Sequence, residues 1–167
     1  MGLITINPTA NQSPDATLGG LAVQTPTNTG YASTTASVGV GGGTQTKSWR
    51  GFSFPAAAGQ IISKTLKVDH TSSGALTGSA DNAFTIEYST NGGANWTFGV
   101  LRTTFTTSQG PLTLSVSLSV GQDVTAVQVR SLCQAFAGAG ETASATGTIS
   151  NVRVEVVTAN PRVVTMF

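Results

Sequence analysis

The chain has 167 residues, a mass of 16.9 kDa and a formal net charge of +1, with 8 Lys and Arg against 7 Asp and Glu. Thr (27), Gly (20), Ala (19) and Ser (17) together occupy half of the positions. This composition excludes a protein that binds nucleic-acid phosphates through clustered Lys and Arg, a charged disordered tail and a Glu/Lys/Leu-rich helical bundle.

The low charge density is itself informative about the surface. A folded single domain of this mass exposes roughly 7,700 Å², and the free surface of a soluble protein usually carries about a quarter charged residues. The 15 charged side chains of this chain fall well short of that density. We therefore expect a subunit whose exterior packs against neighbours, rather than a solitary domain.

Signals for compartment are few and point in one direction. Cys133 is the only cysteine, which excludes an internal disulfide, and its neighbours Val129 and Leu132 predict a buried thiol in a strand. The N-terminal stretch 1–6 has no basic region and is too short for a signal peptide, and no apolar run reaches the roughly 18 residues of a membrane span. We expect synthesis in a cytoplasm without a signal peptide, and no membrane partner.

The first 46 residues differ from the rest. They contain one charged side chain, Asp15, three prolines and a glycine run at 41–43. The alternatives are a flexible linker and an arm that lies along another surface through backbone hydrogen bonds. We divide the chain into an extended Gly/Thr/Ser-rich arm (1–46), a β-sandwich domain (47–158) and a C-terminal tail (159–167).

From residue 47 the pattern is that of successive strands with turns between them. Apolar and polar residues alternate with period two, and no long window shows helical spacing. The inward-facing sets predicted by this alternation are Ile62, Lys64, Leu66 and Val68; Phe84, Ile86 and Tyr88; Trp96, Phe98 and Val100; Leu112, Leu114, Val116, Leu118 and Val120; and Val152, Val154 and Val156. About eight short strands predict an all-β fold, a single antiparallel β-sandwich that is jelly-roll-like, with an N-terminal arm and a short tail.

Signals for catalysis fail on inspection. His70 follows Asp69, but no Gly-x-Ser-x-Gly elbow accompanies the pair, and the histidine is interpreted as a turn residue at a strand end. The glycine run before Lys47 lacks the glycine that a phosphate loop requires next to its lysine. Carboxylates are scattered singly, and no His or Cys spacing suggests a metal site. We expect no enzyme activity, no cofactor and no metal.

One local motif stands out. Ser89-Thr90-Asn91-Gly92-Gly93-Ala94-Asn95-Trp96 resembles the Asp-box, a hairpin of sialidase-like propellers and other secreted β-proteins. The resemblance implies a structural hairpin in which the Ser and Asn side chains satisfy turn amides, glycine supplies positive φ and the tryptophan packs under the turn. It implies no catalytic residue.

A second resemblance bears on sugar binding. Ile149-Ser150-Asn151-Val152-Arg153-Val154 is similar to the terminal strand of jelly-roll carbohydrate modules, which stack sugars on exposed aromatic rings. Trp49 and Tyr31 are the candidate stacking platforms. The alternative is that both rings pack under the arm or a neighbouring subunit.

The layout of the whole chain is similar to the small β-sandwich proteins that decorate phage capsids or build tails and fibres. This resemblance implies a non-enzymatic virion protein that forms a homo-oligomer, with a trimer as one expected state, and that binds other virion proteins such as a capsid shell, without nucleic acid. Its implied assembly contacts are the Ser/Thr face of strand 112–120 and a set of apolar residues in the arm and the tail: Leu3, Ile4, Ile6, Leu21, Val23, Val163, Val164 and Phe167. The alternatives are a carbohydrate-binding jelly-roll module and a subunit of an extracellular filament.

Overall fold

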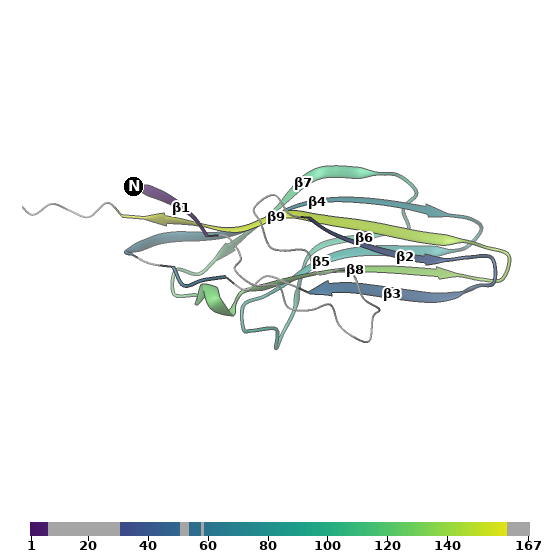
Figure 1. Cartoon of the computed structure of the whole chain (residues 1–167), viewed down its shortest axis with the longest axis horizontal. Coiled ribbons are helices and arrows are strands. Elements are labelled where there is room, and N and C mark those ends of the chain that lie inside the picture. The colour runs from purple at the N-terminus through teal and green to yellow at the C-terminus, as the bar shows by residue number, and fades with distance from the viewer. Residues whose placement is uncertain (7–30, 51–53, 58, 160–167) are drawn as a thin grey trace, which may run out of the picture.

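The computed structural model describes residues 1–6, 31–50, 54–57 and 59–159, with the side chains of 31–34, 45–50 and 150 left out. These ranges form strands joined by short turns and one short 3-10 helix, η2 (Figure 1). In chain order the elements are β1 (Gly2–Ile6), β2 (Tyr31–Val38), β3 (Gly43–Arg50), β4 (Ile61–Leu76), β5 (Asp81–Ser89), β6 (Thr97–Thr103), β7 (Gln109–Leu118), η2 (Val124–Ala126), β8 (Gln128–Ala137) and β9 (Ala143–Thr158).

The strands form two antiparallel sheets that pack face to face. The five-stranded sheet has the order β1-β9-β4-β7, with β2 also paired to β9, and the four-stranded sheet has the order β3-β8-β5-β6. The pairings are nested, because β2 pairs with β9, β3 with β8, β4 with β7 and β5 with β6. A long double ribbon wound in this way is a jelly roll. The predicted all-β sandwich of jelly-roll type is confirmed.

β9, which equals β4 in length at 16 residues, changes phase along its length. Ala145 and Ile149 face the core in its first half, whereas Val152 and Val154 do so in its second half. The register against β4 shifts between Lys67 and Asp69, so β9 holds an extra residue there. Asn151 occupies this bulge with φ +47, a left-handed conformation that asparagine tolerates better than most residues. The predicted inward set Val152, Val154 and Val156 is confirmed as buried.

The core between the sheets is made mainly of small and medium aliphatic side chains, together with the buried rings of Phe54, Phe84 and Phe105. Phe84 of β5 is fully buried, and Gly147 of β9 lies against it, because any Cβ at residue 147 would overlap the Phe84 ring. The largest fully buried side chains are Phe84, Leu66, Ile86, Ile149, Val68, Val124, Val127, Val129, Val154, Val156 and Cys133. The missing side chain at residue 147 thus makes the room that the ring fills.

Three strands of the sandwich come from the segment expected to form an N-terminal arm. β1 and β2 lie end to end along one edge of β9, and β3 pairs with β8, so the expected division at residue 47 falls inside β3. Ile6 is part of the core, whereas Leu3 and Ile4 are exposed. The other predicted assembly contacts lie outside the described residues: Leu21, Val23, Val163, Val164 and Phe167.

The prediction that Phe98 faces inward is wrong. Val100 lies opposite the buried Ile86, but Phe98 lies opposite Glu87, because a register shift between β5 and β6 skips Gly99. The bulge reverses the phase of the strand, so that Phe98 points outward and is 62 % exposed.

Three further residues of the predicted inward sets are also exposed. Ile62 lies where the β4 register against β9 shifts, Leu112 lies on an edge strand, and Val120 follows the end of β7. Each residue lies where strand pairing is interrupted or ends, or where the strand has a neighbour on one side only. The alternation of apolar and polar residues does not reveal such positions.

The contact between Gly147 and Phe84 gives a direct test of this packing. Gly147→Ala is expected to lower the free energy of unfolding by about 1–3 kcal/mol, since the new methyl group overpacks the core. Gly121→Ala is the matched control, because a Cβ at residue 121 meets nothing within 4 Å. Urea unfolding measures both; equal midpoints for the two variants would contradict the packing.

Candidate assembly surfaces

The hairpin between β5 and β6 has the local structure implied by its Asp-box-like sequence. The Ser89 hydroxyl accepts the backbone N–H of Gly93 at 2.9 Å and donates to Asn91 Oδ1 at 2.8 Å. Asn91 Oδ1 also accepts the N–H of Asn95 at 2.9 Å. Gly92 and Gly93 have φ values of +71 and +90. The motif therefore acts as a turn device, as expected.

The tryptophan of this hairpin, which the alternation predicted to face inward, instead packs against a charged pair on the outer face of the four-stranded sheet. A Cβ at Gly93 would lie 3.5 Å from the Trp96 ring, so the ring packs under the turn. The Arg130 guanidinium lies 4.3 Å from the centre of the Trp96 ring and forms an ion pair with Glu87, its cross-strand neighbour. This stacking and pairing covers both charges in part and leaves little free charge on the face.

Three large apolar side chains are exposed on the same face of the sheet. Phe98 is 62 % exposed, Leu101 61 % and Phe136 53 %. Leu101 and Leu132 lie on either side of the buried Thr85, whose hydroxyl has no hydrogen-bond partner within the described part of the chain. We call Phe98, Leu101, Leu132 and Phe136 the outer apolar face.

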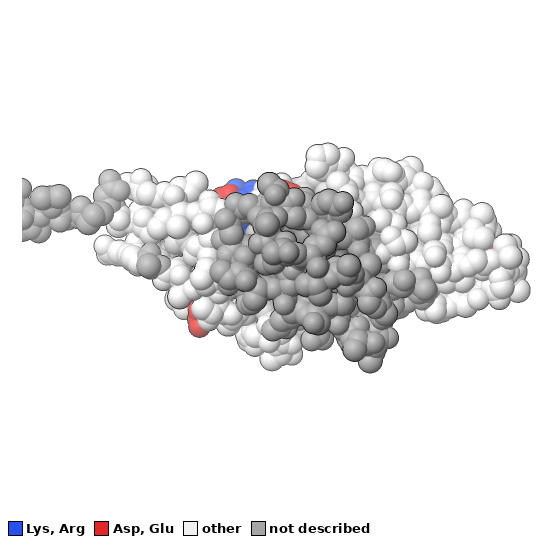
Figure 2. Space-filling model, viewed as in Figure 1, with Lys and Arg blue, Asp and Glu red and all other residues white. Residues whose placement is uncertain are grey.

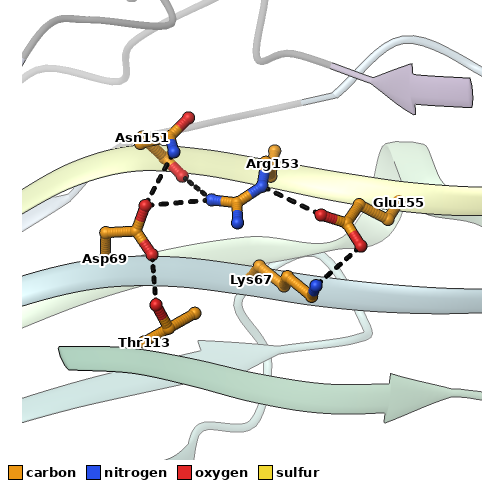
Figure 3. Close-up of polar contacts among 6 residues, drawn as sticks. All are labelled: Lys67, Asp69, Thr113, Asn151, Arg153 and Glu155. Atoms are coloured by element: carbon orange, nitrogen blue, oxygen red, sulfur yellow. Dashed lines mark hydrogen bonds and ion pairs between the residues drawn. The ribbon is translucent and has the colours of Figure 1, made fainter.

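The outer face of the five-stranded sheet instead holds a chain of alternating charges (Figure 3). Lys67 Nζ lies 2.8 Å from Glu155 Oε2, and Arg153 lies 3.1 Å from both Glu155 Oε1 and Asp69 Oδ2. These four residues come from β4 and β9 and are mutually neutralised. The cluster therefore offers no net charge to a partner.

The same cluster fastens the bulge in β9. Asn151 Nδ2 donates to Asp69 Oδ2 at 2.6 Å, and the Asn151 carbonyl accepts from Arg153 at 2.9 Å. The Thr113 hydroxyl of β7 donates to Asp69 Oδ1 at 2.6 Å. Three strands are thus tied together through one carboxylate, which is a structural role for these side chains.

The environment of the cluster shifts its carboxyl groups. Burial raises the pKa of Asp69, but the hydrogen bonds from Thr113, Asn151 and Arg153 and the Arg153 charge outweigh it, so the pKa lies below the ordinary value of 3.8. The hydrogen bond from Lys67 is the main cause that places the Glu155 pKa below 4.5. Both carboxylates are therefore stabilised in the folded state.

Hydroxyl groups dominate the rest of this face. Thr35 of β2 and Thr146 of β9 have their hydroxyl oxygens 3.0 Å apart. A surface pocket is lined by Thr71, Ser72, Ser73, Ser108, Gln109, Gly110, Thr146 and Thr148. In the side view of Figure 2, Lys, Arg, Asp and Glu atoms occupy only small areas of the described surface.

His70 and Cys133, whose side chains could in principle act in catalysis, both lie in the core. His70 lies within β4 rather than in a turn, which corrects the sequence interpretation, and its ring centre is 6.1 Å from that of Phe84. Burial lowers the pKa of His70, and the Asp69 charge opposes this only in part. Asp69 points to the opposite face of the strand. The predicted buried thiol of Cys133 is confirmed, and burial raises its pKa to about 12.

The remaining sequence candidates fall where side chains are not described. The backbone of Trp49 lies opposite Ser131, and that of Tyr31 lies opposite Ser150. The side chains of Trp49 and Tyr31 are outside the described part of the structure. Within the described ranges, no three His, Cys, Asp or Glu side chains come together as a metal site, and no helix has the length and apolarity to cross a membrane.

Comparisons with solved structures find a likeness to a viral chain. No protein-family model and no curated protein matches the chain. A chain in the structure of the infectious bursal disease virus Gx strain aligns with 96 % of this chain at 12 % identity and a TM-score of 0.32. The alignment covers 33 % of that viral chain, so this chain spans about a third of its length.

The pKa values of the charged cluster predict how stability depends on acid. Since the folded-state pKa values of Asp69 and Glu155 are lowered, their contribution is present above the ordinary values of 3.8 and 4.5 and is lost as the pH falls through the folded values. Thr113→Val removes one hydrogen bond to Asp69. It should cost about 1 kcal/mol near neutral pH, and the difference from wild type should shrink as the pH falls, because the acid loss of stability becomes smaller and ends at a higher pH.

Thermal unfolding between about pH 7 and pH 2 measures this effect. The control is Thr103→Val, an exposed threonine on β6. A profile for Thr113→Val that superimposes on that of Thr103→Val would show that the hydrogen bond does not stabilise the Asp69 carboxylate.

Proposed function

We propose that the chain is a non-enzymatic structural subunit of a virion, most specifically a phage capsid decoration protein or another assembly subunit. It works by binding copies of itself and neighbouring shell proteins. The observation that carries this proposal is the outer apolar face, where three large side chains are more than half exposed on one sheet. Exposed apolar clusters of this kind mark protein interaction sites.

The electrostatics of the exterior support the same function. Arg130 is paired with Glu87, and the Lys67–Glu155–Arg153–Asp69 cluster is neutralised internally. A partner that covers these two groups of paired charges does not have to desolvate an unpaired charge there, which is the costly part of burying a polar surface. Serine and threonine hydroxyls can form hydrogen bonds across such a contact.

The fold is compatible with this role without deciding it. Jelly rolls form viral capsid domains, and they also form lectin domains. No cofactor is required for a mechanical function of this type.

The outer apolar face provides the test. Phe98→Ser combined with Leu101→Ser should weaken self-association at least tenfold, because it removes about 1.5–3 kcal/mol of apolar burial for each side chain that the contact covers. Sedimentation equilibrium of the purified chain measures the association. Val40→Ser is the control, since Val40 is 68 % exposed in the β2–β3 turn.

Two results would contradict the proposal. One is a wild-type chain that stays monomeric at every concentration and does not bind purified capsid shells. The other is a double variant that associates as strongly as wild type and as Val40→Ser.

Glycan binding is the second candidate, because of the hydroxyl-lined pocket on the five-stranded sheet. Its lining includes Thr71, Gln109 and Thr148 but no aromatic ring on which a sugar could stack. The candidate ring Trp49 lies on β3 of the other sheet. Binding on a glycan array that Trp49→Ala removes without changing the sedimentation would place the sugar at Trp49, and binding that Trp49→Ala leaves intact would favour the pocket. Absence of any binding by the wild-type chain would discard this function.

A further inference from the structure

The feature that carries a further inference is the outer edge of β7. Within the described residues, β7 is the last strand of the five-stranded sheet and pairs only with β4. Backbone N–H and C=O groups of alternate residues along its other edge therefore point away from the sheet. A row of this kind is a template for pairing with another strand.

Within the described part of the chain, the regular stretch of this edge lacks the devices that usually protect an edge strand. Residues 103–122 contain no charged side chain. The bulge at Gly110 and the missing N–H of Pro111 interrupt only the start of the strand and leave Leu112–Leu118 regular. Lysine, proline and bulges normally keep edge strands from pairing.

The other edges are different. β6 carries Arg102 and the bulge at Gly99, β3 carries Lys47 and Arg50, and β1 has only five residues. β2 is also uncharged, but β3 of the other sheet lies close to it and leaves less room for an added strand. β6 and β7 approach each other at few positions, so the edge of β7 is more open. The regular part of β7 is thus the edge best suited to pairing.

We propose that β7 pairs antiparallel with β7 of a second copy of this chain, about a two-fold axis at Ser115. This inference rests on the proposed structural function and names its partner. Ser115 is the midpoint of the regular stretch 112–118, so a two-fold axis at Ser115 pairs every residue of that stretch. The resulting cross-strand pairs are Leu112 with Leu118, Thr113 with Ser117, Leu114 with Val116 and Ser115 with itself.

The side chains of this pairing match on both faces. The row of Leu112, Leu114, Val116 and Leu118 meets the same row of the partner, and Leu112, which is 43 % exposed in one copy, gains an apolar neighbour. On the other face, hydroxyls meet hydroxyls, and such Thr/Ser pairs stabilise antiparallel strands. No like charges oppose each other. The pairing is closed, because both copies use the same edge.

A cysteine placed on the axis tests the register. Ser115→Cys brings two thiols opposite each other, with Cβ atoms about 4.5–5.5 Å apart, close enough for a disulfide after small adjustment. Ser117→Cys is the matched control, since its two copies lie four residue positions apart, about 13 Å along the strand. Oxidation with diamide followed by non-reducing electrophoresis gives the yield of covalent dimer. Cys133 adds no background, because it is buried.

The expected result is a covalent dimer for Ser115→Cys, with at least a tenfold lower yield for Ser117→Cys. In a second experiment, Ser115→Lys should weaken self-association at least tenfold, whereas Val40→Lys, which places the same charge in the β2–β3 turn, should not.

The outcomes separate the two proposals. No cross-link for Ser115→Cys, or an equal yield for Ser117→Cys, while the wild-type chain still associates, would overturn the β7 pairing and leave the structural function standing. A wild-type chain that remains monomeric would overturn both.

Discussion

The pairing of β9 on both of its edges is the constraint on which the rest of the structure depends. Its first half lies between β2 and β4, and its second half lies between β1 and β4. This strand joins the ends of the chain to its middle and carries inward side chains along its length. It can do so only because the bulge at Asn151 switches the inward phase from odd to even residues. The Asp69 carboxylate holds that bulge through the Asn151 side chain.

The neutral exterior follows from how the few charges are used. Arg130 and Glu87 are paired on one face, and Lys67, Asp69, Arg153 and Glu155 are paired on the other. These charges stabilise the sheets locally and leave hydroxyls and exposed apolar side chains to meet the surroundings. A surface of this kind is poorly protected against contact with other protein, and we interpret it as a surface made for that contact.

Much of the fold could be predicted from local patterns. Alternation identified the inward residues of β4, β5 and the end of β9, and the Asp-box-like motif gave the hydrogen bonds of the β5–β6 turn. The buried Cys133 followed from its apolar neighbours. These features depend on residues close in sequence, which is why a single sequence is enough to show them.

The errors arose where distant pairing decides the outcome. The bulge at Gly99 turned Phe98 outward, and it depends on how β6 lies against β5 rather than on β6 alone. β1, β2 and much of β3 look like an arm because they are uncharged and interrupted by proline and glycine, yet β8 and β9 supply their partners. The outer apolar face was missed for the same reason. A strand with apolar residues in both phases, as at Phe98 and Leu101, was the available signal.

The central claim is that the neutral edges and faces of this jelly roll are completed by contact with other copies. Hydrogen exchange of the β7 amides, followed by mass spectrometry at low and high protein concentration, tests it most directly. The account predicts that exchange in 112–118 slows as the concentration rises, while exchange in β6 changes less, because outward N–H groups of β7 become hydrogen-bonded. Exchange in 112–118 that stays fast and does not depend on concentration would contradict it.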